Sequence, residues 1–365
     1  MAYGTVNADV IGTSSPNSNL GAGNASIMKN RIINGAMVID QRNAGASVTP
    51  ANGGYTLDRW GANQTTASKF SVQQNAGSVT PPVGFSKYLG ATSLSAYSVG
   101  ASDIFALYQI IEGFNIADLN QGTANAKTVT LSFQVYSSLT GTFGGSLAIN
   151  GSTTRSYPFT YSVPTANTWT SISVTVAGDT FTNTVSTTNT AGMSVYFGLG
   201  GGSTYSGTAN TWASADYRTA TGATSVVGTN GATFYITGVQ LEVGSIATGY
   251  EYRMYNQELS ACQRYYQLTN NFSGSGATST AAAGLCFWSQ MRANPTLGLQ
   301  GAYSLTDGYA LDYTQSSASI AVNATGAINN VGAYTLLSNL SSVTNGRPMY
   351  SRFGNTNQIT LSAEL

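Results

Sequence analysis

The chain has 365 residues, of which only 8% are charged, with 14 basic and 14 acidic side chains and no histidine. The lack of histidine excludes His-based acid–base catalysis, Ser-His-Asp and Cys-His nucleophiles, and the commonest transition-metal ligand. We therefore expect no enzymatic activity and no cofactor, and we name no metal ligand, although a β-sandwich can hold a structural ion with scattered carboxylates and carbonyls. Because the charges balance, no net field attracts nucleic acid or an anionic membrane surface, so we expect no nucleic-acid partner.

Residues 1–30 are rich in Gly, Ser and Asn and show no sustained periodicity, so this segment cannot form a core of its own. We predict an N-terminal attachment or assembly arm that is ordered by a partner, with a disordered tail as the alternative. Residues 1–10 show no secretory signal, and no run approaches the roughly 20 apolar residues of a membrane span. We therefore expect a soluble protein made in a cytoplasm, with no membrane insertion.

Short apolar stretches separated by turn residues begin at residue 31. The first, RIINGAMVIDQRN (31–43), is typical of a strand. The clearest alternation runs from Thr128 to Tyr136, where every second residue is apolar and the residues between are polar. Similar runs occur around residues 172–176 and 193–199. Many short strands of this kind, bounded by Gly, Thr and Asn, predict a β-sandwich.

The segment TFYITGVQLEV (233–243) changes the phase of its apolar residues by one position at Thr237-Gly238. Since a strand must keep its apolar side chains on one face, we predict a β-bulge at Gly238 that restores the facing. The apolar positions on the two sides of this point are Phe234 and Ile236, then Val239, Leu241 and Val243.

The C-terminal third begins with the one convincing helix, residues 256–267, which Asn256 caps and in which Leu259, Cys262 and Tyr266 recur at helical spacing. Residues 270–284 (NNFSGSGATSTAAAG) are typical of a linker, and strand patterns return from about residue 285. The two cysteines, Cys262 and Cys286, fit no CxxC motif, and we expect both to be buried free thiols.

The predicted fold is therefore all-β. It consists of the arm at 1–30, a jelly-roll-type β-sandwich at 31–253, a helix and linker at 254–284, and a smaller β domain at 285–365.

Carboxylate chemistry is the enzymatic alternative that remains without histidine, because a glycosidase needs two acids on the two sides of a cleft. The acids without an evident structural role are Asp103, Glu112, Asp118, Asp179, Asp216, Asp307 and Asp312.

Aromatic residues suggest a different site. Tyr and Trp rings pack on the apolar faces of sugars while amides and Arg bond the hydroxyls. Trp212, Tyr217 and Arg218 lie together in a polar loop region and form the best candidate cluster for glycan binding, although each aromatic could instead fill a core or a subunit interface.

Three segments resemble a bacteriophage tail-fibre or tail-associated virion protein family: NRIINGAMVIDQRNAGASV with GYTLDRW (30–60), VQLEVGSIATGYEYRMYNQELSACQRYYQ (239–267) and MRANPT (291–296). The opening MAYGTVNADVIGTS and the closing SAEL are also similar to chains of that group. The sandwich resembles jelly-roll carbohydrate-binding modules at Asn34-Gly35 and at Gly238–Glu242.

The family resemblance implies a homotrimeric appendage on the virion surface, assembled in the host cytoplasm, that contacts host-surface polysaccharide. Residues 1–30 would then join it to other virion proteins, and the C-terminal β domain would lie at the distal end, touching a surface glycan. The alternatives are a head fibre or capsid-decoration protein, a free carbohydrate-binding module and a polysaccharide depolymerase.

Overall fold

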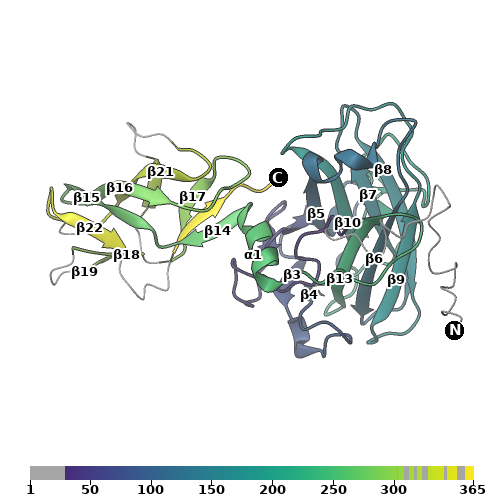
Figure 1. The fold of residues 1–365 in the computed structure, drawn as a ribbon. Coiled ribbons are helices and arrows are strands. Elements are labelled where there is room, and N and C mark those ends of the chain that lie inside the picture. The colour runs from purple at the N-terminus through teal and green to yellow at the C-terminus, as the bar shows by residue number, and fades with distance from the viewer. Residues whose placement is uncertain are drawn as a thin grey trace, which may run out of the picture. The chain divides into compact units, whose positions relative to one another are not determined.

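The computed structural model describes residues 29–301, 303–307, 312–315, 319–322, 328–340, 343–351 and 358–365. They form two compact units, the first ending at Tyr255 and the second comprising Asn256–Glu364 (Figure 1). Strands dominate both units, which confirms the all-β prediction. The predicted arm lies outside the described residues, except for Lys29 and Asn30.

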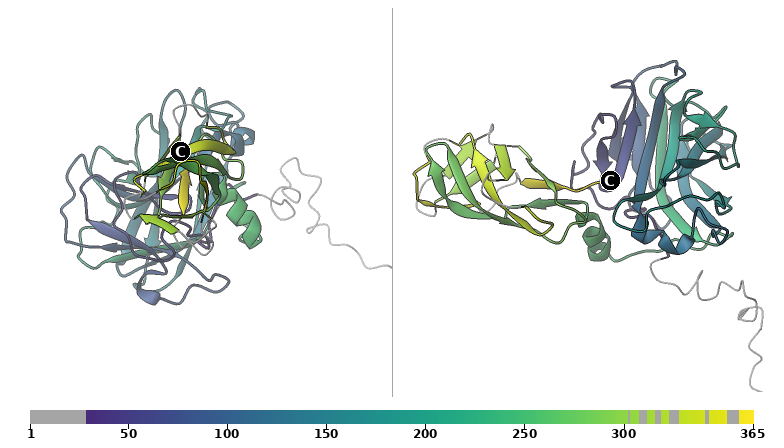
Figure 2. Two further views of the ribbon diagram at one scale, coloured as in Figure 1. Left: turned by 90° about the vertical axis from the view of Figure 1, so that its left-hand side faces the viewer. Right: turned by 90° about the horizontal axis from the view of Figure 1, so that it is seen from above.

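The first unit is a β-sandwich of two antiparallel sheets, which Figures 1 and 2 show as facing layers. The order across the six-stranded sheet is β1 (Tyr55–Leu57), β2 (Trp60–Gln64), β5 (Ile104–Glu112), β10 (Ala191–Gly201), β7 (Gly141–Ile149) and β8 (Arg155–Val163). The order across the five-stranded sheet is β3 (Phe70–Gln74), β4 (Leu89–Ser93), β13 (Thr233–Val243), β6 (Val129–Ser137) and β9 (Thr170–Val176). The loops carry the short elements η3 (Ala76–Ser78), η4 (Gly113–Asn115), η5 (Ala117–Leu119), β11 (Ser206–Gly207) and β12 (Thr219–Ala220).

Alternating apolar residues of both sheets form the sandwich core. On β6 the predicted inward residues are all at most 2% exposed: Val129, Leu131, Phe133 and Val135. Phe133 meets Phe197 of β10 edge to face, with ring centroids 5.0 Å apart, so the two sheets interlock through aromatic packing. The predictions for residues 128–136, 172–176 and 193–199 correspond to β6, β9 and β10 and are confirmed.

The β-bulge predicted at Gly238 is confirmed. Thr237 pairs with Gln134 and Gln240 pairs with Ser132, so two residues of β13 oppose one residue of β6. Gly238 has φ +62°, and a Cβ on it would lie 2.5 Å from the ring of Phe85. Glycine is therefore needed both for the left-handed backbone of the bulge and for the approach of Phe85.

The strand predicted for residues 31–43 is wrong: this segment consists of turns and extended chain. Asn34 is the physical reason, because its buried side chain satisfies backbone groups that a ladder would otherwise pair. Its amide donates to the carbonyls of Ile39 and Asp58 at 2.8 and 3.0 Å, and its carbonyl accepts from Ile39 N at 3.0 Å. Asn34 and Met37 also have positive φ, which a strand does not allow.

The second unit contains all of α1 (Tyr255–Gln263) except its first residue, and two sheets. The three-stranded sheet has the order β14 (Tyr266–Thr269), β23 (Ile359–Ser362) and β17 (Thr296–Leu299). The seven-stranded sheet has the order β19 (Asp312–Gln315), β18 (Tyr303–Thr306), β22 (Pro348–Ser351), β15 (Phe272–Thr278), β16 (Ala281–Phe287), β21 (Gly332–Ser338) and β20 (Ser319–Val322).

Two predictions in this unit need correction. The helix ends at Gln263 rather than Gln267, because residues from Tyr266 pair with β23. The predicted linker at 270–284 instead forms most of the β15–β16 hairpin inside the seven-stranded sheet. Its small residues allow the close approach of these strands, since a Cβ on Gly274 would lie 2.1 Å from the carbonyl of Ala283.

Both cysteines are buried free thiols, as predicted. Burial raises the pKa of Cys286 to about 12, so its thiol stays protonated and inert at neutral pH. Among the residues that the structure describes, no helix is long and apolar enough to cross a membrane.

Candidate functional site

A groove of about 400 Å³ lies on the outer face of the five-stranded sheet. Strands β6 and β9 supply polar side chains to it, and the segments around Phe85 and Tyr250 supply aromatic rings. None of its lining residues carries a charge. They are Phe85, Ser132, Phe133, Gln134, Ser171, Ile172, Ser173, Gly238, Ala247, Thr248, Gly249, Tyr250 and Tyr252.

The polar side of the groove follows directly from strand alternation. Ser132 and Gln134 occupy the positions of β6 that face away from the core, and Ser171 and Ser173 do the same on β9. Gln134 and Ser171 are cross-strand partners joined by hydrogen bonds of 2.8 and 3.0 Å. Ser132 and Ser173 make no side-chain hydrogen bond within the described residues, so their hydroxyls remain available to a ligand.

Three aromatic rings form the opposite side. Phe85 packs against Tyr250 and Tyr252 with centroid distances of 5.1 and 5.7 Å, and the two tyrosines are 4.9 Å apart. The Tyr252 hydroxyl donates to the carbonyl of Gly84 at 2.8 Å, while the residue remains 60% exposed. Because Gly238 has no side chain, the Phe85 ring of this cluster can lie against the bulge of β13. The result is a fixed aromatic surface that is open to solvent.

The segment after β13 forms the wall that carries Tyr250 and Tyr252, and buried polar groups hold it in place. The carboxylate of Glu242, only 1% exposed, accepts from the backbone N of Thr248 at 2.8 Å and from its hydroxyl at 2.6 Å. Thr130 and Thr175 donate to the carbonyls at residues 244 and 245. The wall is therefore preorganised by the sandwich, which lowers the entropic cost of binding.

A second aromatic cluster extends the same face. Tyr136 lies two residues beyond Gln134 on β6 and stacks on Tyr235, with centroids 5.3 Å apart and planes inclined by 5°. Trp169 lies 5.5 Å from both Tyr88 and Tyr136, edge-on to the first ring and tilted against the second. Because residues i and i+2 of a strand share a face at about 7 Å spacing, the polar positions at 132 and 134 lead directly to the ring of Tyr136.

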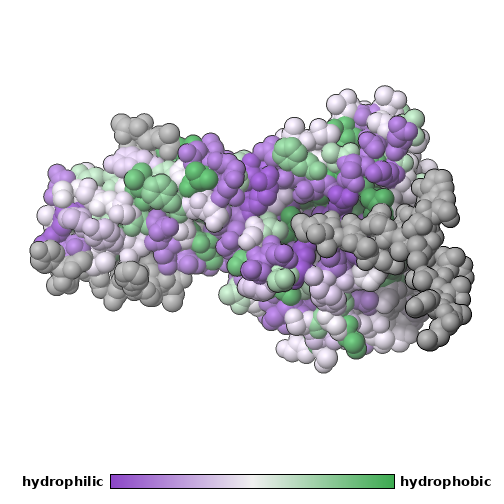
Figure 3. All heavy atoms as spheres, viewed as in Figure 1, coloured by the Kyte–Doolittle hydropathy of each residue, from purple (hydrophilic) through white to green (hydrophobic). Residues whose placement is uncertain are grey.

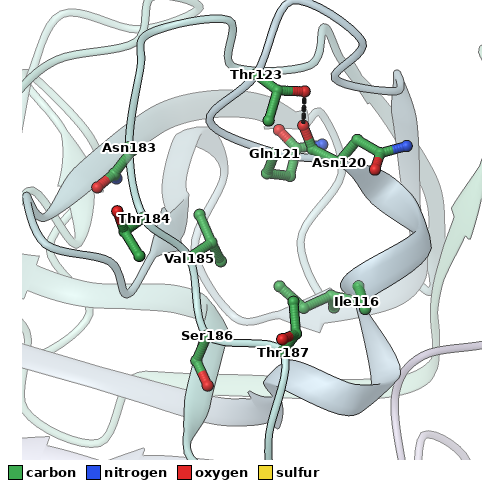
Figure 4. Close-up of a pocket in the computed structure, with 10 residues that line it drawn as sticks. Ile116, Asn120, Gln121, Thr123, Asn183, Thr184, Val185, Ser186 and Thr187 are labelled. Atoms are coloured by element: carbon green, nitrogen blue, oxygen red, sulfur yellow. Dashed lines mark hydrogen bonds between the residues drawn. The ribbon is translucent and has the colours of Figure 1, made fainter.

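A pocket of about 330 Å³ elsewhere in the first unit has a different character (Figure 4). Asn120, Gln121 and Thr123 lie on one side and Asn183 and Thr184 on the other. No aromatic residue lines it. Gln121 bonds Lys127 O and Asp179 N at 2.8 Å each, and Asn183 bonds Thr153 through both ends of its amide. These amides hold loops together, so the pocket is the weaker ligand site.

The predicted cluster of Trp212, Tyr217 and Arg218 lies in the loop of residues 202–218. Trp212 packs on Tyr157 at 5.3 Å and donates to the carbonyl of Ala177 at 2.8 Å. Arg218 pairs with Asp216 at 2.7 Å, and its guanidinium lies 5.4 Å from the ring centroid of Tyr196.

The ring of Tyr217 covers Gly207, where an added Cβ would lie only 2.2 Å from it. The three side chains therefore have partners within the loop and the adjoining sheet, and their glycan-binding role stays a prediction.

Most of the candidate acids have identifiable partners. Asp118, Asp179, Asp216 and Asp307 form ion pairs with Arg31, Arg155, Arg218 and Arg347. Asp103 accepts hydrogen bonds from Gly100 N and from the hydroxyls of Thr65, Thr66 and Tyr97. Glu112 is buried in β5, and the side chain of Asp312 is outside the description. In the described ranges, no group of three or more His, Cys, Asp and Glu is placed to hold a metal ion.

The groove itself could not be predicted from the sequence, because its residues come from segments up to 167 positions apart (Phe85 to Tyr252). One signal was present: the segment 239–267, singled out by resemblance, includes the wall of the groove.

On the face shown in Figure 3, hydrophilic and weakly polar residues cover the larger part of the described surface, interrupted by smaller apolar patches.

No protein-family model and no curated protein matches the chain. Among solved structures, the chain is similar to the enzymatically active domain of bacteriophage CBA120 tailspike protein 4, with 12% identity and a TM-score of 0.33 over 59% of this chain and 22% of that one. The larger part of the tailspike chain therefore has no counterpart in the match.

Two carbohydrate-binding modules are matched over nearly their whole length. The family 11 module from Clostridium thermocellum, solved in complex with a β-1,3-1,4-mixed-linked tetrasaccharide, shares 11% identity over 55% of this chain and 97% of its own, with a TM-score of 0.27. The CBM22-1 xylan-binding domain from Paenibacillus barcinonensis shares 9% identity over 56% and 99%, with a TM-score of 0.28. Because these TM-scores lie below 0.5, the similarities carry no argument about this chain.

Proposed function

We propose that this chain is a non-enzymatic virion subunit, a bacteriophage tail-fibre protein, that binds a neutral host-surface glycan in the groove of the five-stranded sheet. The observation that carries glycan binding is the groove itself. It has a fixed aromatic wall opposite a row of Ser and Gln side chains, and none of its lining residues is charged.

The chemistry of the groove matches that of an uncharged sugar. The C–H face of a pyranose packs on an aromatic ring, and its hydroxyls both donate and accept hydrogen bonds, as Ser and Gln do. An anionic ligand would need Arg or Lys, which the lining does not supply. The second cluster around Tyr136 extends the platform, which favours a chain of several sugars over a single one.

Binding of the purified 365-residue chain to an array of neutral and acidic host-surface saccharides tests this proposal. Tyr252→Ala removes an exposed ring, and Gln134→Ala removes the central amide. Each variant is expected to weaken binding of the bound neutral saccharide by about fivefold to tenfold, because an aromatic contact or hydrogen bond contributes roughly 1 kcal/mol.

Tyr255→Ala is the matched control, since Tyr255 is 63% exposed but does not line the groove. Unchanged affinity in both groove variants would place the glycan elsewhere. A preference for acidic saccharides would contradict the neutral ligand.

The virion role rests on the family resemblance and has its own test. A tail-fibre subunit is expected to sediment as a trimer, and a labelled antibody against it should decorate the tails of whole virions in electron micrographs. Labelling of the head would identify a head fibre or capsid-decoration protein instead. A monomer that labels no virion would leave a free carbohydrate-binding module.

The non-enzymatic role is tested by incubating the protein with host polysaccharide and measuring reducing ends. We expect no release above the buffer control. Release that is lost on replacing one of the candidate acids, for example in Asp216→Asn, would show a depolymerase.

A further inference from the structure

The second unit contains a pocket of about 390 Å³ that is separate from the groove. It lies between the end of α1, the turn from β14 to β15, and the chain that follows β16. Its lining residues are Gln263, Gln267, Leu268, Thr269, Asn271, Phe287, Trp288 and Ser289. All of them belong to the second unit, and none is charged.

Three polar side chains of the pocket are unengaged. The side chains of Gln263, Asn271 and Ser289 neither donate nor accept a hydrogen bond within the described part of the chain. Amides and hydroxyls both donate and accept, so they can pair with a ligand that has many hydroxyls. In the pocket of Figure 4, by contrast, the amides of Gln121 and Asn183 are already satisfied.

Trp288 lines the pocket and carries a buried polar atom. The residue is 9% exposed, and its indole Nε1 is buried without a hydrogen-bond partner among the residues that the structure describes. Tryptophan N–H groups normally find an acceptor when they are buried. This nitrogen is enclosed in the present conformation, so a ligand oxygen would accept from it only after the side chains around it move.

Phe287 and Gln267 supply an exposed ring and a buried amide to the walls of the pocket. Phe287 is 55% exposed and offers an open ring next to Trp288. Gln267 is buried and fixes the frame, because its amide donates to the carbonyls of Gln263 and Ser289 at 2.8 Å each and accepts from Ser289 N at 3.2 Å. The end of α1 and the segment after β16 are thus held together before any ligand arrives.

From these observations we infer that the pocket at Trp288 is a second glycan-binding site, specific for a short neutral saccharide that stacks on Phe287 and bonds Gln263, Asn271 and Ser289. The inference extends the proposed glycan-binding function but depends on different residues. Two sites on one chain would strengthen attachment to a polymeric surface by raising the effective concentration of each glycan at the other site.

The test uses four versions of the 365-residue chain on an array of neutral and acidic saccharides. They are the wild type, the groove variant Tyr252→Ala/Gln134→Ala, the pocket variant Phe287→Ala/Asn271→Ala, and a variant with all four substitutions. The groove variant is expected to retain binding to at least one neutral saccharide, and the pocket substitutions are expected to weaken that binding about tenfold. Leu285→Ala is the control, because Leu285 lies on β16 and is 48% exposed but does not line the pocket.

The outcomes separate the two proposals. If the groove variant binds nothing, or if its residual binding is unaffected by the pocket substitutions, the pocket is not a glycan site. If the pocket substitutions remove all wild-type binding and the groove substitutions remove none, the groove proposal fails and the pocket stands. If the wild-type chain binds no saccharide, both fail.

A spectroscopic readout reports on the pocket directly. The indole ¹⁵N–H resonance of Trp288, assigned by its loss in Trp288→Phe, is expected to shift when the retained saccharide is titrated into the groove variant. The resonance of Trp212, whose N–H already bonds Ala177, should stay in place. A saccharide that binds without moving the Trp288 signal would overturn the assignment.

Discussion

Arg155 and Asp179 form a buried ion pair in the first unit, with two parallel hydrogen bonds of 2.8 and 2.9 Å and side chains 9% and 3% exposed. Removing one partner leaves an uncompensated buried charge, so Arg155→Ala is expected to lower the free energy of unfolding by about 3–5 kcal/mol. Urea denaturation measures this. Asp118→Asn breaks the more exposed pair with Arg31 and should cost less than about 1 kcal/mol. Equal costs in the two variants would contradict the prediction.

Asp103 makes the folding stability of the first unit depend on pH. Burial disfavours its ionised form, but hydrogen bonds from Gly100 N, Tyr97, Thr65 and Thr66 outweigh this, and the pKa is lowered from its ordinary value of 3.8. Since the folded-state pKa lies below the unfolded one, the stabilisation is present above about pH 4 and is lost as the pH falls through the folded value. Asp103→Asn should therefore lower the melting temperature at pH 7 and change it less at pH 3. A difference in melting temperature between the variant and the wild type that is larger at pH 3 than at pH 7 would contradict the prediction.

At the scale of single residues, the sequence predicted burial better than it predicted contacts. The alternation on β6 identified its core side chains correctly, and the spacing in α1 identified Cys262 as buried. Trp212 and Arg218 are close in the chain, but the sequence did not predict their contacts: Trp212 donates to the carbonyl of Ala177, and Arg218 pairs with Asp216. Side-chain contacts depend on the register between distant strands, which local spacing does not specify.

At the scale of elements, the bulge of β13 links the fold to the groove. Gly238→Ala is expected to destabilise the first unit by about 1–3 kcal/mol and to weaken glycan binding, because the new methyl group displaces Phe85. Gly231→Ala is the control: Gly231 also has positive φ, but nothing lies within 4 Å of its Cβ position. Both variants strain the backbone, but only Gly238→Ala also clashes with Phe85. Comparing their unfolding free energies and their binding to the array therefore separates the two effects. Equal losses of binding would show that Phe85 does not support the groove.

Two segments were misassigned from the sequence, each for a reason that local periodicity does not show. Periodicity reports which face of a strand is buried, and it fails where small or polar residues replace apolar ones. The β15–β16 hairpin contains Gly274 and Gly284, whose missing side chains let the strands approach, so it resembles a linker. The segment at 31–43 is apolar enough for a strand, but the buried amide of Asn34 satisfies the backbone in its place. Tertiary contacts decided both cases.

At the scale of the whole molecule, each unit has a hydrophobic core of its own. Leu131 belongs to the core of the first unit and Leu305 to that of the second, and both are fully buried. A Leu→Ala change at either site creates a cavity that costs about 2–5 kcal/mol. Because the cores are separate, calorimetry should show two transitions, with Leu131→Ala lowering one midpoint and Leu305→Ala the other. Leu305→Ala should also leave the affinity of the groove unchanged at temperatures where the first unit stays folded. A single transition that both substitutions shift would mean that the two units fold as one.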